Sequence, residues 1–151
     1  MAEVVAGSTQ HQGSADLAAM ATYLKELPVR TTTIVAIYAP ATSEAGRKLY
    51  ERHCSGCHGE QGQGVAGAYR ALTGNRAVLL TPAANLVHVV LRGGFPPTAA
   101  GNPRPFGMPP FATVMTDSEV ASAISYGRGA WANRPAPVST LEVARFHGSA
   151  R

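Results

Sequence analysis

Two absences limit what this sequence encodes. No uninterrupted apolar run comes near the ~20 residues that a membrane-spanning helix needs, although 45% of the 151 residues are hydrophobic. Charged residues are scarce, at 15% against roughly 25% in an ordinary soluble domain. The 13 basic residues outnumber the 9 acidic ones, but they form no basic run of the kind that nucleic-acid binding requires. We therefore expect neither a membrane span nor a nucleic-acid partner. The basic side chains expected in solvent include Arg47, Arg76, Arg92, Arg104, Arg128 and Arg145.

Signals for β-strands are also missing beyond residue 42, where the apolar residues instead recur at helical spacing. A first helix is expected over residues 14–27, followed by a proline-punctuated, extended connector over 29–42. The length of the chain fits one compact domain with some surplus. We therefore predict an all-α domain over residues 43–148, preceded by an extra helix and an extended linker.

Four helices are expected inside this domain, and each has a capping residue. The caps are Ser43, Thr81, Thr116 and Ser139, and the helices are expected to end near residues 54, 92, 128 and 148. Pro82 would occupy the first helical position after its cap. Met115 and Val120 flank the third cap as a hydrophobic staple, which predicts that Met115 has a packing role.

The sequence has only two cysteines, and both lie in Cys54-Ser55-Gly56-Cys57-His58. A structural zinc site would need two histidines at finger-like spacing, whereas His88 and His147 lie downstream and far apart. A thioredoxin-type dithiol would follow a strand in a βαβ unit, and no strand precedes this motif. Neither alternative fits the surrounding sequence.

Covalent haem fits all five positions of the motif. The thiols of Cys54 and Cys57 would form thioether bonds with the haem vinyl groups, and the His58 imidazole would bind the iron from one face. A flat porphyrin would also supply a hydrophobic core to a chain rich in loops. We therefore predict one haem c in the domain.

The second axial ligand decides whether such a haem carries electrons or binds a gas or peroxide. The candidates are Met108, Met115, His88 and His147. Met108 is favoured because it ends a long loop between a glycine and two prolines, a rigid flank that suits a ligand. The predicted metal ligands are therefore His58 and Met108.

The residues around the motif resemble class I cytochrome c domains, over about residues 43–148. In that family a Gly-x-x-x-aromatic helix precedes the cysteines, as Gly46 and Tyr50 do here. The resemblance implies that these two residues cross the 117–128 helix near Ala123 and Tyr126. It also implies that a backbone carbonyl accepts a hydrogen bond from His58. The family usually has proline at that position, where this chain has Arg70.

Several segments look most like the last haem domain of the multihaem cytochrome subunit of membrane-bound alcohol, gluconate and sorbitol dehydrogenases. These segments are His58-Gly59, 71–75, 85–94 and 107–111. The resemblance implies an electron-transfer subunit that is not catalytic alone. It would take electrons from a periplasmic quinoprotein, flavoprotein or molybdenum dehydrogenase and pass them to ubiquinone or a downstream cytochrome. It would lie at the outer face of the inner membrane, associated with the membrane through the complex.

Residues 14–25 repeat the pattern of 117–128, with acidic, aliphatic and tyrosine positions in register. Two C-terminal cytochrome helices are thus present beside one haem motif. The sequence also shows no export signal at its start. We therefore expect residues 1–28 to be the tail of a preceding haem domain in a longer subunit. The alternative to an electron carrier is a haem enzyme or gas sensor with a displaceable sixth ligand.

Overall fold

The computed structural model describes residues 2–28, 43–131, 133 and 135–147. These residues fall into two units, one made of 2–28 with 95–107 and the other of the described residues within 43–94 and 108–147. Met1, the expected connector over 29–42 and the expected helix end at Gly148 lie outside the described residues. Each unit is taken by itself below.

The first unit contains α1 (Ala2–Gly7), a 3-10 turn η1 (Thr9–His11) and α2 (Ser14–Glu26). The sequence predicted α2 to within one residue but missed α1 and η1. No residue of α2 is buried, and its large apolar side chains Leu17, Met20 and Leu24 are 41%, 46% and 62% exposed. The apolar stripe of α2 therefore has no partner among the described residues of its unit.

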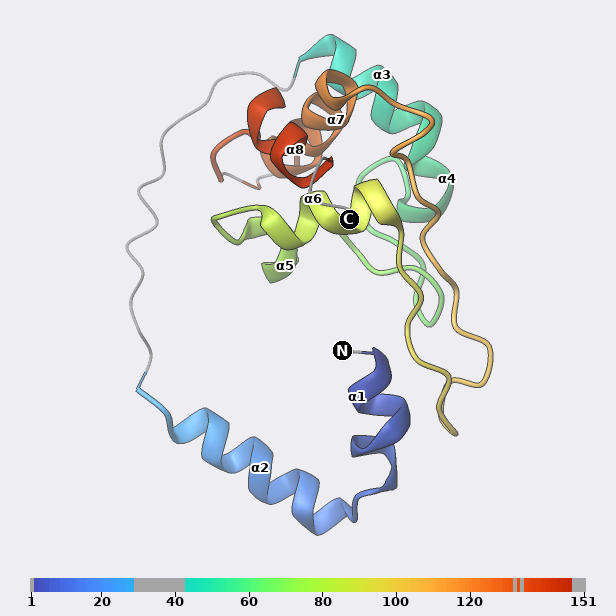
Figure 1. Cartoon of the computed structure of the whole chain (residues 1–151), viewed down its shortest axis with the longest axis vertical. Coiled ribbons are helices and arrows are strands. Elements are labelled where there is room, and N and C mark those ends of the chain that lie inside the picture. The colour runs from blue at the N-terminus through green and yellow to red at the C-terminus, as the bar shows by residue number, and fades with distance from the viewer. Residues whose placement is uncertain (1, 29–42, 132, 134, 148–151) are drawn as a thin grey trace. The chain divides into compact units, whose positions relative to one another are not determined.

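The second unit is a bundle of helices joined by long loops (Figure 1). In chain order its helices are α3 (Glu44–His53), α4 (Ser55–His58), α5 (Arg76–Leu79), α6 (Ala84–Arg92), α7 (Asp117–Gly129) and α8 (Thr140–His147). The described residues contain isolated β-bridges but no strand. The prediction of an all-α fold is confirmed.

The crossing of α3 and α7 organises this unit. A Cβ atom on Gly46 would lie 2.5 Å from the carbonyl oxygen of Ser122, so only glycine lets the two backbones approach so closely. One turn later Tyr50 is 2% exposed, with its ring centroid 5.4 Å from that of Tyr126. The crossing expected from the family resemblance, close to Ala123 and Tyr126, is confirmed.

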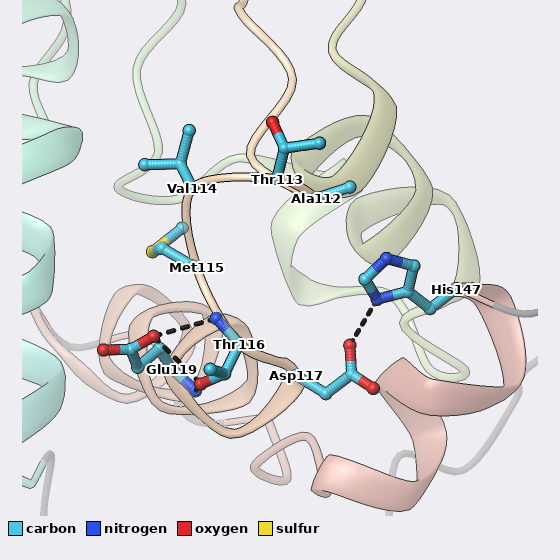
Figure 2. A pocket seen from close by; sticks show the side chains of 8 residues that line it. All are labelled: Ala112, Thr113, Val114, Met115, Thr116, Asp117, Glu119 and His147. Carbon is cyan, nitrogen blue, oxygen red and sulfur yellow. Dashed lines mark hydrogen bonds and ion pairs between the residues drawn. The ribbon is translucent and has the colours of Figure 1, made fainter.

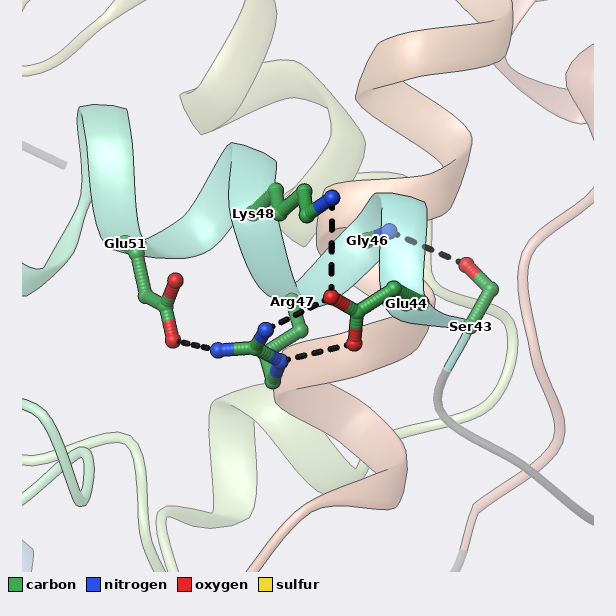
Figure 3. Close-up of polar contacts among 6 residues, drawn as sticks. All are labelled: Ser43, Glu44, Gly46, Arg47, Lys48 and Glu51. Carbon is green, nitrogen blue, oxygen red and sulfur yellow. Dashed lines mark hydrogen bonds and ion pairs between the residues drawn. The ribbon is translucent and has the colours of Figure 1, made fainter.

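The outer face of α3 carries its charges, as Figure 3 shows. Ser43 caps the helix by accepting a hydrogen bond from the Gly46 N–H at 3.0 Å. Arg47 pairs with both Glu44 and Glu51 along the same face. These side chains are largely exposed, so the pairs contribute little stability. They keep the polar face of α3 in solvent while Gly46 and Tyr50 face α7.

The start of α7 has the capping box that the sequence predicted (Figure 2). The Thr116 N–H donates to Glu119 at 2.8 Å, and the Glu119 N–H donates to Thr116 Oγ1 at 3.3 Å. Met115 and Val120 are 4% and 0% exposed, and both belong to the main hydrophobic cluster. Met115 therefore has the packing role that the staple pattern assigned to it.

The start of α6 differs from the sequence prediction. Thr81 does not cap the helix, which begins at Ala84 after Ala83. The Thr81 hydroxyl instead accepts a hydrogen bond from Arg128 Nη2 at 3.3 Å. A long-range partner has thus replaced the local cap that the sequence suggested.

Arg128 was expected in solvent and is 1% exposed, so that prediction was wrong. Its Nη1 donates to the carbonyls of Val78 at 2.6 Å and Leu80 at 2.8 Å, and its Nε donates to Ala136 O at 3.0 Å. Burial lowers the pKa of Arg128 from its ordinary value. Because its donors find acceptors, the buried guanidinium is tolerated and ties α7 to α5 and to the loops at Leu80 and Ala136.

None of the helices among the described residues is long and apolar enough to cross a membrane.

Candidate functional site

The Cys-x-x-Cys-His motif lies where α3 gives way to α4. Cys54 ends α3, with its N–H donating to Tyr50 O at 2.8 Å. The N–H groups of Cys57 and His58 both donate to Cys54 O, at 3.2 and 2.9 Å. This single helical turn places the two cysteines and the histidine on one face, because residues three and four apart are neighbours on a helix.

The two cysteines are partly buried and are not joined in a disulfide. Burial, with a smaller contribution from Cys57, raises the pKa of the Cys54 thiol to about 11. The apolar surroundings of Cys54 thus favour its neutral thiol over the thiolate. Within the described ranges, no three His, Cys, Asp or Glu side chains gather as a metal-binding group.

The His58 ring has one defined partner. Its Nδ1 lies 2.9 Å from the carbonyl oxygen of Arg70, as the family resemblance implied. A carbonyl oxygen only accepts hydrogen bonds, so the proton of the imidazole must be on Nδ1. That tautomer leaves Nε2 with a free lone pair, which is the state that a metal-ligating histidine needs.

The loop after His58 brings the Arg70 carbonyl back to the ring. Gly64 donates its N–H to His58 O at 2.7 Å, and Val65 and Tyr69 exchange backbone hydrogen bonds of 2.8 and 2.9 Å. Gly64 has a φ of +66°, and a Cβ there would overlap the backbone of Tyr69 and Arg70. The loop can therefore close on the imidazole only with glycine at position 64.

Met108 lies at the far end of the 95–107 loop, and its backbone is fixed to the residues that follow α6. Its N–H donates to Gly94 O at 2.8 Å, and the Gly94 N–H donates back to Met108 O at 3.0 Å. Gly93, at a φ of +71°, would overlap Met108 O if it carried a Cβ. The Met108 side chain is partly buried and packs against the hydrophobic cluster. The flanking prolines predicted a rigid segment, and this antiparallel pairing supplies a second reason for it.

The other candidate axial ligands have partners of their own. Met115 is buried in the core. The ring of His88 makes an edge contact with Phe146 at 5.5 Å between centroids. His147 Nδ1 lies 2.6 Å from Asp117 Oδ1, beside the pocket drawn in Figure 2. Each of these three side chains thus makes packing or polar contacts of its own.

Two residues of the site were missed by sequence reasoning. Trp131 packs its ring at 5.0 Å from that of Tyr50 and 5.6 Å from that of Tyr126, measured between centroids. Asn133 is 5% exposed and binds the loop that follows the haem motif. Only the uniqueness of the tryptophan could have drawn attention to this segment.

An all-α unit with a glycine and tyrosine crossing, a Cys-x-x-Cys-His turn and a histidine held by a backbone carbonyl defines a cytochrome c type of domain. Residues 43–131 match the cytochrome c family, and the chain belongs to that family. Membership implies covalently bound haem c. The donor set fits this group, since two free thiols and an imidazole whose Nδ1 faces a backbone carbonyl lie on one helical turn.

The chain is similar to the cytochrome c subunits of two kinds of dehydrogenase. It is 32% identical over 159 residues to the cytochrome c subunit of the quinone-type alcohol dehydrogenase of Gluconobacter oxydans (strain 621H). The identity is again 32%, over 158 residues, for that of Gluconacetobacter polyoxogenes. It is 29% over 156 residues for the gluconate 2-dehydrogenase cytochrome c subunit of Pantoea cypripedii. These matches cover 95–97% of this chain but 33–35% of the relatives. The chain thus spans about a third of their length.

Proposed function

We propose that the domain formed by residues 43–148 carries one haem c and transfers electrons. Cys54 and Cys57 would form its thioether bonds, and His58 Nε2 and Met108 Sδ would bind its iron. When bound, this group supplies the reversible one-electron chemistry of its iron. The observation that carries the proposal is the His58–Arg70 hydrogen bond, because it fixes the tautomer in which Nε2 is free to ligate.

Met108 is proposed as the sixth ligand because its own N–H and carbonyl groups both form hydrogen bonds with the backbone of Gly94. A thioether opposite an imidazole raises the reduction potential, as electron-carrying cytochromes require. The packing of Met115 and the contacts of His88 and His147 support the same choice. With His58 and Met108 as its two iron ligands, the proposed site would be closed to other ligands.

The names of the similar proteins support a place in a larger complex. We propose that the chain belongs to a cytochrome c subunit that relays electrons from a periplasmic dehydrogenase to ubiquinone or a downstream cytochrome. In this role it is not catalytic alone. It lies at the outer face of the inner membrane and associates with the membrane through the complex.

Acid–acetone extraction tests the covalent attachment. The protein produced in a periplasm with haem-ligating machinery should keep its haem in the precipitated protein, because thioether bonds survive this treatment. The double variant Cys54→Ala/Cys57→Ala should release any haem that it binds. Release of all haem from the unchanged protein would contradict the proposed function.

We also propose that α2 is the C-terminal helix of a preceding cytochrome c domain. Its sequence repeats that of α7, yet Leu17 is exposed where the matching Val120 is fully buried. In α7 that face is covered by other helices of the same domain, α3 among them. Amide exchange in the haem-loaded chain tests the proposal, since an uncovered α2 should exchange fast. Slow exchange across residues 14–26 would contradict it.

A further inference from the structure

The segment that follows α7 returns to the loop that carries the partner of His58. Trp131 has a φ of +51°, a left-handed conformation that a bulky side chain rarely adopts. Strained backbone of this kind persists only where surrounding contacts hold it, and it is concentrated at functional sites. The contacts made by Trp131 and Asn133 therefore indicate which part of the molecule the strained segment holds in place.

The Trp131 ring lies directly on the α-carbon of Gly62. A Cβ on Gly62, which has a φ of +65°, would be 2.6 Å from the ring. Tyr50 and Tyr126 also contact the indole, both in edge-to-face geometry. Tyr50 in turn donates its hydroxyl hydrogen to Gly59 O at 2.6 Å. The start of the loop, at Gly59 and Gly62, is thus held by contacts with Tyr50 and Trp131.

Asn133 holds the other end of the loop. Its Nδ2 donates to Leu72 O at 3.2 Å and to Gly127 O at 3.1 Å, and its Oδ1 accepts from the Gly74 N–H at 3.0 Å. The side chain is 5% exposed, so these bonds are shielded from water. One buried amide therefore joins the end of α7 to residues 72 and 74.

The two ends meet at Gly62. Its carbonyl oxygen accepts hydrogen bonds from the Leu72 N–H at 2.7 Å and the Thr73 N–H at 3.1 Å. Arg70, which accepts the hydrogen bond from His58, lies two residues before Leu72. Trp131 packs on Gly62, and Asn133 forms hydrogen bonds to residues 72 and 74. Together these contacts restrict where the Arg70 carbonyl can lie.

We propose that Trp131 and Asn133 are positioning residues that set the reduction potential by holding the Arg70 carbonyl on His58 Nδ1. This inference rests on the proposed function, because it takes His58 as an axial ligand. A hydrogen bond donated from Nδ1 makes the imidazole a more basic ligand, which favours the ferric state. We call Trp131 and Asn133 the clamp. When the clamp holds the loop less firmly, the His58–Arg70 hydrogen bond weakens and the reduction potential becomes more positive.

The test compares Trp131→Leu and Asn133→Ala with Val143→Ala. Val143 is fully buried in α8, so its truncation destabilises the same unit without touching the clamp. Each clamp variant should lower the equilibrium ratio of ferric to ferrous protein about tenfold. This change equals a positive shift of the potential by ~59 mV for one electron. The His58 Nδ1 proton, followed by NMR, should exchange faster with solvent in both. Trp131→Phe, which keeps a ring on Gly62, should shift the potential less than Trp131→Leu.

Three outcomes bear on the inference. Positive shifts in both clamp variants, with none in Val143→Ala at a similar loss of unfolding free energy, support it. Haem-loaded clamp variants whose potential and His58 proton exchange match the unchanged protein overturn it. An equal shift in Val143→Ala also overturns it, because general loosening would then suffice. Failure of the unchanged protein to retain haem on acid–acetone extraction would instead contradict the proposed function.

Discussion

Met108 is held at a fixed place because two hydrogen bonds join its backbone to Gly94. Met108→Ala should therefore remove the sulfur-to-iron charge-transfer band near the red end of the oxidised spectrum. It should also lower the potential, because a soft thioether favours ferrous iron. Visible spectroscopy and a redox titration measure the two effects.

Met115→Ala is the matched control. Met115 is 4% exposed in the core, so its truncation should cost about 2–5 kcal/mol of unfolding free energy. The charge-transfer band and the potential should not change. If Met115→Ala removed the band and Met108→Ala kept it, the ligand assignment would be wrong.

Arg128 shows how a single residue can join distant loops. Arg128→Lys should lower the free energy of unfolding by roughly 1–3 kcal/mol, because a lysine ammonium lacks the planar fork that reaches both Val78 O and Ala136 O. Chemical denaturation measures the loss. A variant as stable as the unchanged protein would show that the buried hydrogen bonds contribute nothing net.

Residue roles were predictable where a local pattern encodes them. The hydrophobic staple with Val120 predicted the packing role of Met115, and the family motif predicted the backbone partner of His58. Arg128 and Trp131 were not predictable, because their partners lie about 50 and 70 residues earlier in the chain. Nothing in the neighbouring sequence indicates such contacts.

The close crossing of α3 and α7 depends on a missing side chain. Gly46→Ala would place a methyl group against the Ser122 carbonyl, and backbone cannot move aside as a flexible side chain can. We expect a loss of about 1–3 kcal/mol in unfolding free energy, measured by chemical denaturation.

Gly127→Ala in α7 is the control for this crossing. A Cβ at Gly127 meets no atom within 4 Å, so the higher helix propensity of alanine should leave the stability unchanged or raise it by up to ~1 kcal/mol. Equal effects of the two substitutions would mean that the crossing is not limited by the glycine.

At the scale of elements, capping and periodicity predicted α2, α3, α7 and α8 to within about a residue at their described ends. The start of α6 moved to Ala84 because Arg128 occupies the Thr81 hydroxyl. The helix α5 escaped prediction because four residues are too few for helical periodicity to be visible. Local signals thus place helices well, except where a distant side chain competes for the cap.

At the scale of the whole molecule, the production compartment should decide whether haem is attached. The resemblance to this family implies that the thioether bonds form outside the cytoplasm, from thiols that are kept reduced. Expressed alone in the cytoplasm, the chain should accumulate without covalent haem. A red cytoplasmic product that keeps its haem through acid–acetone extraction would contradict this expectation.

The relatives are about three times as long as this chain, and α2 repeats the α7 pattern although none of its residues is buried. Both observations fit the proposal that this unit works in series with other electron carriers. In such a series the site must stay closed, so that electrons pass along the relay and do not reach oxygen or carbon monoxide.

Carbon monoxide binding tests this central claim most directly. The visible spectrum of the reduced, haem-loaded protein should not change when carbon monoxide is added, because the proposed ligands His58 and Met108 would leave no open position on the iron. Fast and complete formation of a carbon monoxide adduct would contradict an electron carrier and would favour a haem enzyme or gas sensor.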